Sequence, residues 1–244
     1  MTRFRIVALS TGVAFAASIA VAIAGTPFGG DDSGTIPSDA PKGQVTKCES
    51  GVAKAAAKLV GSIFKCHAGR TTGKFADDTA ENACESTALT KFGATKTAGC
   101  RGCTDLGLLG TVLEGMVDTN NDAIYCELTG TPFGGDDSSG FIPPDAPKGA
   151  ETKCSNRVGK AIGKLVRSIT KCHIGRARGK FTDDTAENGC ETTAENKVLA
   201  LKTAACDPCL GNLVLQVAIY FEGQVDGAPN GLIWCGSPSG TFLQ

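Results

Sequence analysis

Cysteine is the residue type of this chain whose number and spacing most directly imply chemistry. The 244-residue sequence contains twelve cysteines, and all of them lie beyond an N-terminal stretch with the features of an export signal. An even number of cysteines in an exported chain is typical of a disulfide framework. We therefore predict six structural disulfides, formed by Cys48, Cys66, Cys84, Cys100, Cys103, Cys126, Cys154, Cys172, Cys190, Cys206, Cys209 and Cys235.

Two pairs of these cysteines have the C-x-x-C spacing that thiol–disulfide oxidoreductases use. Cys100–Cys103 and Cys206–Cys209 each lie where a helix is expected to begin, and a helix N-terminus lowers the pKa of a thiol. No β-α-β pattern surrounds either pair, and a disulfide framework would use all four cysteines. We favour structural bridging and keep redox activity as an alternative.

The two histidines, His67 and His173, each follow a cysteine directly and are candidate metal ligands. Neither belongs to a C-x-x-C-H sequence, so covalent haem attachment is not supported. One histidine beside an oxidised cysteine is a poor zinc ligand set, whereas a histidine in the last turn of a helix interacts favourably with the helix dipole. We favour this helix-end interpretation and retain both residues as weak metal candidates.

Oxygen side chains alternate at Asp118, Asn120 and Asp122, as they do in the first half of a calcium-binding loop. Ala123 stands where such a loop requires glycine, which favours an Asx-rich turn and leaves the three residues as weak metal candidates. Asp31-Asp32 and Asp136-Asp137, which follow paired glycines, could also hold calcium, but such acidic turns are expected to face water. The remaining acidic cluster is expected to cap a helix and form its exposed face: Asp77, Asp78, Glu81 and Glu85.

Catalytic motifs are absent from the sequence in recognisable form. It contains no G-x-S-x-G, no P-loop and no H-E-x-x-H, and two histidines leave few acid–base options. We predict no catalytic residue and no cofactor, and we favour a non-enzymatic role while the oxidoreductase alternative stays open.

An internal repeat organises the chain. The segment from Thr26 to Ser33 matches the segment from Thr131 to Ser138, and the six cysteines of each copy then recur in the same order. We predict a signal peptide at 1–24, a Gly/Asp/Pro-rich segment at 25–43, six-cysteine repeats at 44–126 and 150–235, a linker at 127–149 and a tail at 236–244. The Gly/Asp/Pro-rich segments lack helical or strand periodicity and are expected to be linkers or ordered loops.

Apolar residues recur every three or four positions through most of each repeat. In the first copy this pattern predicts helices from about Val45 to Cys66, from about Asp78 to Ala98 and from about Cys103 onward, with an acidic cap before the second. The expected fold class is all-α, with two tandem disulfide-stapled bundles of about three helices each. Antiparallel packing favours Cys66–Cys84, Cys48 with Cys100 or Cys103, and the remaining C-x-x-C cysteine with Cys126.

Arg3 and Arg5 precede an uncharged apolar run that ends in small residues, which is typical of a cleaved signal peptide. The mature chain is expected to be secreted or periplasmic and not to insert stably into membranes. Its near-neutral charge, formally −1, provides no basic patch for nucleic acid. The partner classes that remain open are an unknown protein, a surface and a small apolar ligand.

Five short motifs give the chain a resemblance to a family. They are F-G-G-D-D at Phe133–Asp137, K-C-E at Lys47–Glu49, K-C-H at Lys65–His67, C-x-x-C at Cys100–Cys103, and the pair Pro143-Pro144. It resembles a group of predicted secreted bacterial Cys-rich tandem-repeat proteins. That resemblance covers nearly all of the mature chain and implies no activity.

The leading functional hypothesis is a secreted, disulfide-rich structural or binding module. Three alternatives stay open: a carrier that holds an apolar ligand between its helices, a thiol–disulfide oxidoreductase, and a protein that binds calcium or another metal.

Overall fold

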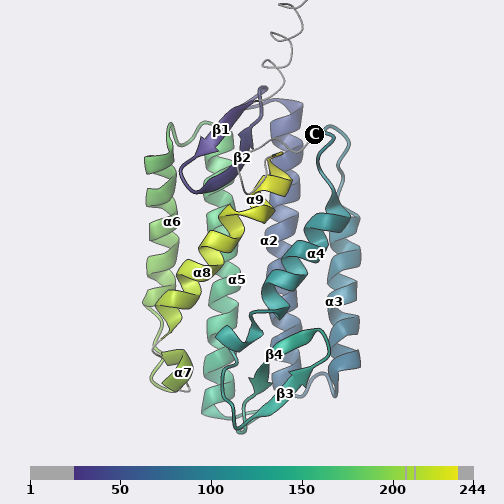
Figure 1. Ribbon diagram of the computed structural model, residues 1–244, viewed down its shortest axis with the longest axis vertical. Coiled ribbons are helices and arrows are strands. Elements are labelled where there is room, and N and C mark those ends of the chain that lie inside the picture. The colour runs from purple at the N-terminus through teal and green to yellow at the C-terminus, as the bar shows by residue number, and fades with distance from the viewer. Residues whose placement is uncertain (1–24, 207, 212, 236–244) are drawn as a thin grey trace, which may run out of the picture.

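Two long helices form the centre of the molecule. In this computed structural model, which describes residues 25–206, 208–211 and 213–235, α2 (Gln44–Thr71) and α5 (Ala150–Ala177) run side by side (Figure 1). A Cβ atom on Gly163 would lie 3.3 Å from the Cα atom of Gly61, so glycine lets the two helices approach closely. The predicted signal peptide and the C-terminal tail lie outside the described residues.

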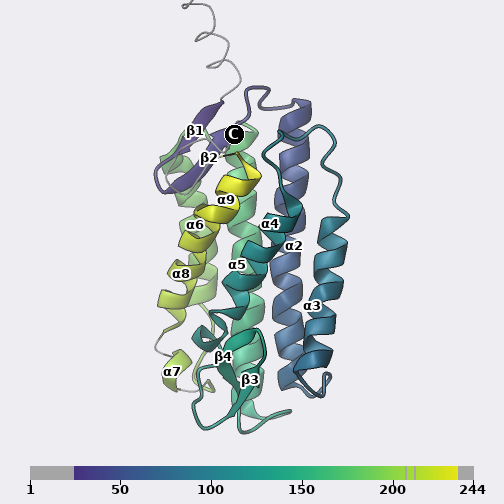
Figure 2. The ribbon, with the colours of Figure 1, turned by 45° about the vertical axis from the view of Figure 1, so that its right-hand side comes forward.

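Four shorter helices flank this central pair. On either side of it lie α3 (Asp78–Gly93), which packs on α2, and α6 (Asp184–Leu199), which packs on α5. Across this layer run α4 (Leu106–Asp118), over α2 and α3, and α8 (Val214–Asp226), over α5 and α6 (Figure 2). The mostly helical character predicted from the sequence is confirmed.

The acidic helix caps predicted from the sequence are present. The Asp77 carboxylate accepts a hydrogen bond of 2.9 Å from the Ala80 backbone N–H, and Asp183 accepts one of 2.9 Å from Ala186. A carboxylate in this position satisfies a backbone N–H that has no partner within the helix. The caps therefore fix where α3 and α6 begin.

The segments expected to be linkers or ordered loops contain β-hairpins. One hairpin pairs β1 (Thr26–Gly29) with β2 (Asp32–Ile36), and the other pairs β3 (Thr131–Gly134) with β4 (Asp137–Ile142), both antiparallel. Each hairpin has short strands, a proline in its first strand and a tight glycine turn between the strands. These features mask the alternation of apolar and polar residues by which a strand is usually recognised. The all-α prediction is therefore correct for the bundle but misses these strands.

Each hairpin packs on the other half of the chain. We call residues 25–126 the first unit and residues 127–235 the second unit. The ring of Phe28, in the first-unit hairpin, lies 5.4 Å from that of Trp234 in the second unit. The ring of Phe133, in the second-unit hairpin, lies 5.1 Å from that of Tyr125 in the first unit. All four side chains are almost fully buried, so the exchanged hairpins belong to the core.

Three short elements complete the fold: η1 (Asn121–Ala123), α7 (Pro208–Gly211) and α9 (Ala228–Ile233). Among the described residues, no helix is both long enough and apolar enough to cross a membrane.

All twelve cysteines are paired, as predicted. Cys66–Cys84 and Cys48–Cys100 form as expected, and the second unit repeats them as Cys172–Cys190 and Cys154–Cys206. The pairing expected between the other C-x-x-C cysteine and Cys126 is wrong, because the remaining bridges join the units: Cys103–Cys235 and Cys126–Cys209. The halves are thus linked covalently and do not form two separate bundles.

Candidate metal centres

A buried cluster surrounds His67 of α2. Its Nε2 atom lies 3.0 Å from Glu85 Oε1, 3.4 Å from Asp118 Oδ1 and 3.0 Å from Asp137 Oδ1. All four side chains are at least 96% buried. One imidazole nitrogen therefore faces three carboxylate oxygens away from solvent.

The second unit builds the same cluster around His173 of α5. Its Nε2 atom lies 3.0 Å from Asp32 Oδ1, 2.9 Å from Glu191 Oε1 and 3.1 Å from Asp226 Oδ1. These are the equivalent residue types on the equivalent elements. We call the two clusters the His67 site and the His173 site.

The fold positions each ligand from a different element. In the His67 site the histidine comes from α2, Glu85 from α3, Asp118 from the last residue of α4 and Asp137 from the first residue of β4. Asp137 belongs to the second-unit hairpin, just as Asp32 of the first-unit hairpin completes the His173 site. Neither unit supplies a complete site alone.

A disulfide adjoins two ligands in each site. Cys66 and Cys84 directly precede His67 and Glu85, and the bridge between them holds the Cα atoms of the two cysteines 5.8 Å apart. Cys172–Cys190 does the same beside His173 and Glu191. These bridges fix the separation of the two helices at the level of the ligands.

Hydrogen bonding alone does not account for this geometry. A single Nε2–H points in one direction and cannot satisfy three oxygens, and His67 Nε2 makes no hydrogen bond of acceptable geometry. Ligands about 2.1 Å from a central ion lie about 3.0 Å apart at octahedral angles and about 3.4 Å apart at tetrahedral angles. The N–O separations of 2.9–3.4 Å fall in that range.

The clusters also carry an excess of buried negative charge. Glu81 lies beside the His67 site with a fully buried side chain, and Arg70 Nε lies 3.9 Å from its carboxylate. Burial and the neighbouring Asp137 raise the pKa of Glu81 to about 8, and burial raises the pKa of Glu85 to about 7. A bound cation would relieve this repulsion, because it stabilises the ionised carboxylates.

The carboxylates also favour the charged form of each histidine. Although burial opposes a charged imidazole, the three carboxylates raise the pKa of His67 well above its usual value, and the pKa of His173 is raised in the same way. A metal ion would replace this proton, since a ligating imidazole is neutral.

The structure changes several predictions about these residues. His67 and His173 face carboxylates and not helix-end carbonyls, so the helix-end interpretation is wrong. Glu81 and Glu85 are buried and not exposed, as are Asp32 and Asp137. Hydrophobic periodicity assigns acidic residues to an exposed face. Their presence at the same positions in both copies was the feature of the sequence that could have identified these residues as part of a site.

The predicted calcium-like loop does not converge on one point. Asp118 belongs to the His67 site, whereas Asp122 is exposed and the Asn120 side chain donates a hydrogen bond to the Met116 carbonyl. Of these three candidates, only Asp118 lies in a group that could hold an ion.

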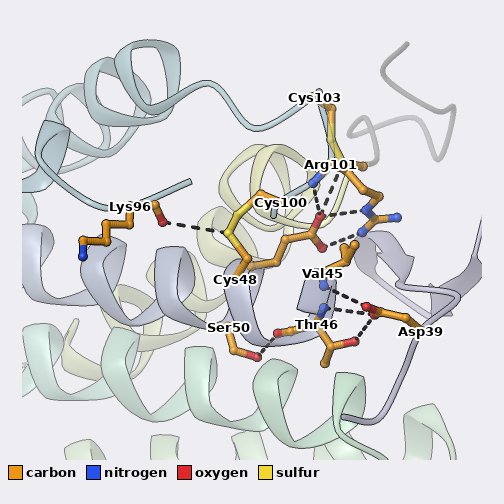
Figure 3. The surroundings of a disulfide bond; sticks show 11 residues. Asp39, Val45, Thr46, Cys48, Ser50, Lys96, Cys100, Arg101 and Cys103 are labelled. Carbon is orange, nitrogen blue, oxygen red and sulfur yellow. Dashed lines mark hydrogen bonds and ion pairs between the residues drawn. A yellow bond between two sulfur atoms is a disulfide. The ribbon is translucent and has the colours of Figure 1, made fainter. Parts of the chain in front are cut away.

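The C-x-x-C pairs form no internal disulfide. Cys100 bonds to Cys48 and Cys103 to Cys235, and Figure 3 shows Cys103 apart from the Cys48–Cys100 bridge. Between them, Arg101 forms a bidentate pair with the buried Glu49, with both N–O distances 2.7 Å. This loop therefore has an evident structural role.

A groove of about 580 Å³ lies between α2 and α5. Pockets for apolar ligands are lined mainly by hydrophobic side chains. This groove contains Phe64 but also five cationic side chains, Lys65, Lys74, Lys160, Lys164 and Arg167. It gives the apolar-carrier alternative no specific support.

Comparisons with protein-family models, with curated proteins and with solved structures found no match for the chain. The functional argument therefore rests on the geometry of the two sites.

Proposed function

We propose that this protein is an exported, disulfide-stapled module that binds divalent metal ions at the His67 and His173 sites. The observation that carries the proposal is the convergence of three buried carboxylate oxygens on one imidazole nitrogen, which occurs twice in the chain. The disulfide-rich helical framework suits an oxidising compartment and holds the ligands in place.

The ligand set favours particular metals. Carboxylate oxygens suit Mn²⁺, Mg²⁺ and Ca²⁺, whereas imidazole nitrogen suits Zn²⁺, Fe²⁺ and other transition metals. One nitrogen with three oxygens therefore favours Mn²⁺, Fe²⁺ or Zn²⁺ over Ca²⁺, and the absence of a free thiolate disfavours Cu(I).

Metal binding explains a feature that folding alone does not. Two copies of a folding module need only share the residues that fold it, and buried carboxylates without counter-charge destabilise a fold. Both copies nevertheless keep the histidine and the carboxylates, which supports a role for these residues beyond stability.

The test is a metal titration of the mature protein after chelator treatment. Equilibrium dialysis against Mn²⁺, and separately against Zn²⁺, with elemental analysis should show at least one ion bound at each site. The double variant H67A/H173A should lose more than about 100-fold in affinity, because it removes a direct ligand from each site.

Asp122→Asn is the matched control, because Asp122 is exposed and lies outside both sites. Circular dichroism should confirm that each variant keeps its helices. A wild-type protein that binds neither metal at micromolar concentration, or a folded H67A/H173A variant that binds like D122N, would overturn the proposal.

A further inference from the structure

A second group of oxygen ligands adjoins the His173 site. One carboxylate oxygen from each of Asp32, Asp184 and Glu187 can be chosen so that all three lie within 4.8 Å of one another. Asp32 also belongs to the histidine group, so the two groups share this residue.

The side chain of Glu187 provides the strongest indication that this second group binds a ligand. This side chain is fully buried, and neither of its oxygens accepts a hydrogen bond from an N–H or hydroxyl donor. Arg176 Nε lies 3.8 Å from Glu187 Oε2 but also makes no hydrogen bond. A buried carboxylate is normally satisfied by hydrogen bonds, by a close ion pair or by a metal ion.

The shared aspartate has one oxygen for each group. Asp32 Oδ1 lies 3.0 Å from His173 Nε2, while Asp32 Oδ2 is buried and has no hydrogen-bond partner. A carboxylate can bridge two cations through its two oxygens, and paired metal ions in proteins lie about 3.5–4 Å apart.

The first unit repeats the arrangement. Glu81 is fully buried with both oxygens unpartnered, and Asp137 Oδ1, Asp137 Oδ2 and Asp78 Oδ1 also have no hydrogen-bond partner. Arg70 Nε stands 3.9 Å from Glu81, as Arg176 Nε stands from Glu187 at 3.8 Å. The same unsatisfied set thus occurs at a second, separate place.

We infer that each site is dinuclear, with a second, all-oxygen cation position formed by Asp32, Asp184 and Glu187 in one site and by Asp137, Asp78 and Glu81 in the other. The inference rests on the proposed function. Asp32 and Asp137 bridge the two ions of their sites, and three carboxylates select a hard divalent ion such as Mn²⁺ for the outer position.

The glycine pair of each hairpin fits this assignment. Gly30 has a φ of +58°, and a Cβ atom there would collide with the Asp184 carboxylate; Gly135, with a φ of +62°, stands in the same relation to Asp78. Only glycine lets the hairpin backbone lie directly against the second ligand group. The Gly-Gly-Asp-Asp sequence thus places both the turn and the bridging carboxylate.

The test compares Mn²⁺ binding by the full mature chain with that of Glu81→Gln/Glu187→Gln. Glutamine keeps the shape of glutamate while removing the charge, so the variant should remain folded. The wild-type protein should take up two ions at each site and show an exchange-coupled Mn²⁺ resonance spectrum. The variant should take up one ion at each site and show an uncoupled six-line spectrum.

Asp78→Asn/Asp184→Asn should cause the same loss, because it changes a different ligand of the same position. Glu127→Gln is the matched control, since its carboxylate accepts hydrogen bonds from Thr129 in a turn outside both sites. A folded wild-type protein that saturates with one uncoupled ion per site would overturn the dinuclear inference and leave the proposed function standing. Absence of any bound metal would overturn both.

Discussion

The His67 and His173 sites have the same ligands but different surroundings. At the ligand positions the two units have identical residue types, whereas Phe64 beside His67 is replaced by Thr170 beside His173, and Tyr125 is replaced by Trp234. Packing has thus diverged between the units while the polar cluster has not. This difference indicates that a requirement other than core packing keeps the ligand residues the same in both units.

The hairpins that complete the sites are also anchored differently. Thr35 of β2 accepts a hydrogen bond of 2.7 Å from Arg101 Nη1 at its Oγ1 atom and one of 2.8 Å from Arg101 Nη2 at its carbonyl. Arg101 is in turn paired with Glu49. The second unit has Ser155 at the position of Glu49, so it cannot repeat this pair. The Arg101 anchor therefore acts on the hairpin of the His173 site.

The largest expected effect comes from substituting the aspartate that one hairpin or the other contributes, Asp32 or Asp137. In a chain that keeps only the His173 site (H67A), Asp32→Asn should reduce metal affinity by more than about 100-fold, because it removes a charged ligand supplied by the first unit. In the same background Asp137→Asn should change that affinity little. Calorimetric titration of the two double variants distinguishes them, and equal losses would show that the hairpins do not serve separate sites.

The next effect concerns the Arg101 anchor. Arg101→Met leaves the fully buried Glu49 without its cation, so the free energy of unfolding should fall by about 3 kcal/mol. Metal affinity should weaken at the His173 site, whose Asp32 shares β2 with Thr35, and stay unchanged at the His67 site.

Denaturant unfolding and site-specific titrations measure these two quantities. The control E49Q/R101M removes the unpaired charge and should recover part of the lost stability. An equal loss of affinity at both sites would show that Arg101 stabilises the whole chain and does not anchor one hairpin.

How far the sequence predicts this structure depends on the kind of interaction. Helix periodicity and the Asp77 cap are local, so α2, α3 and α4 could be anticipated together with the Cys66–Cys84 bridge. The cross-unit bridges depend on how two similar units pack, and nothing in the spacing of the cysteines shows which copy supplies the partner.

The candidate sites were predictable only in part. His67, His173 and Asp118 stood out by residue type, but Glu85 and Asp137 looked like solvated acids. Their burial follows from the tertiary arrangement of α3 and the exchanged hairpin, which a local pattern does not encode. Asking which polar residues both copies retain would have selected them.

A smaller effect is expected from pH. Burial raises the pKa of Glu81 to about 8 and that of Glu187 to about 9, so the folded metal-free protein holds protons that the unfolded chain releases above pH 4.5. Its stability should therefore fall as pH rises from about 5 to about 9. Thermal unfolding across this range, with chelator present, measures the trend.

Metal binding should show the opposite trend. The ligands must lose their protons, so affinity should rise with pH at both sites. H67A and H173A each isolate one site for titration between pH 6 and pH 9. Affinity that does not change with pH at either site would contradict the assignment of these carboxylates as ligands.

The smallest effect should be equal in the two units. Asp77→Ala and Asp183→Ala each remove one N-cap hydrogen bond of 2.9 Å, so each should lower the free energy of unfolding by about 1 kcal/mol. The caps are in different units and share no partner, so the double variant should lose about 2 kcal/mol. Asparagine also caps helices and serves as the control, since D77N and D183N should lose little. Denaturant unfolding measures all five variants, and a clearly larger loss in one unit would show that the N-caps of the two units do not contribute equally to stability.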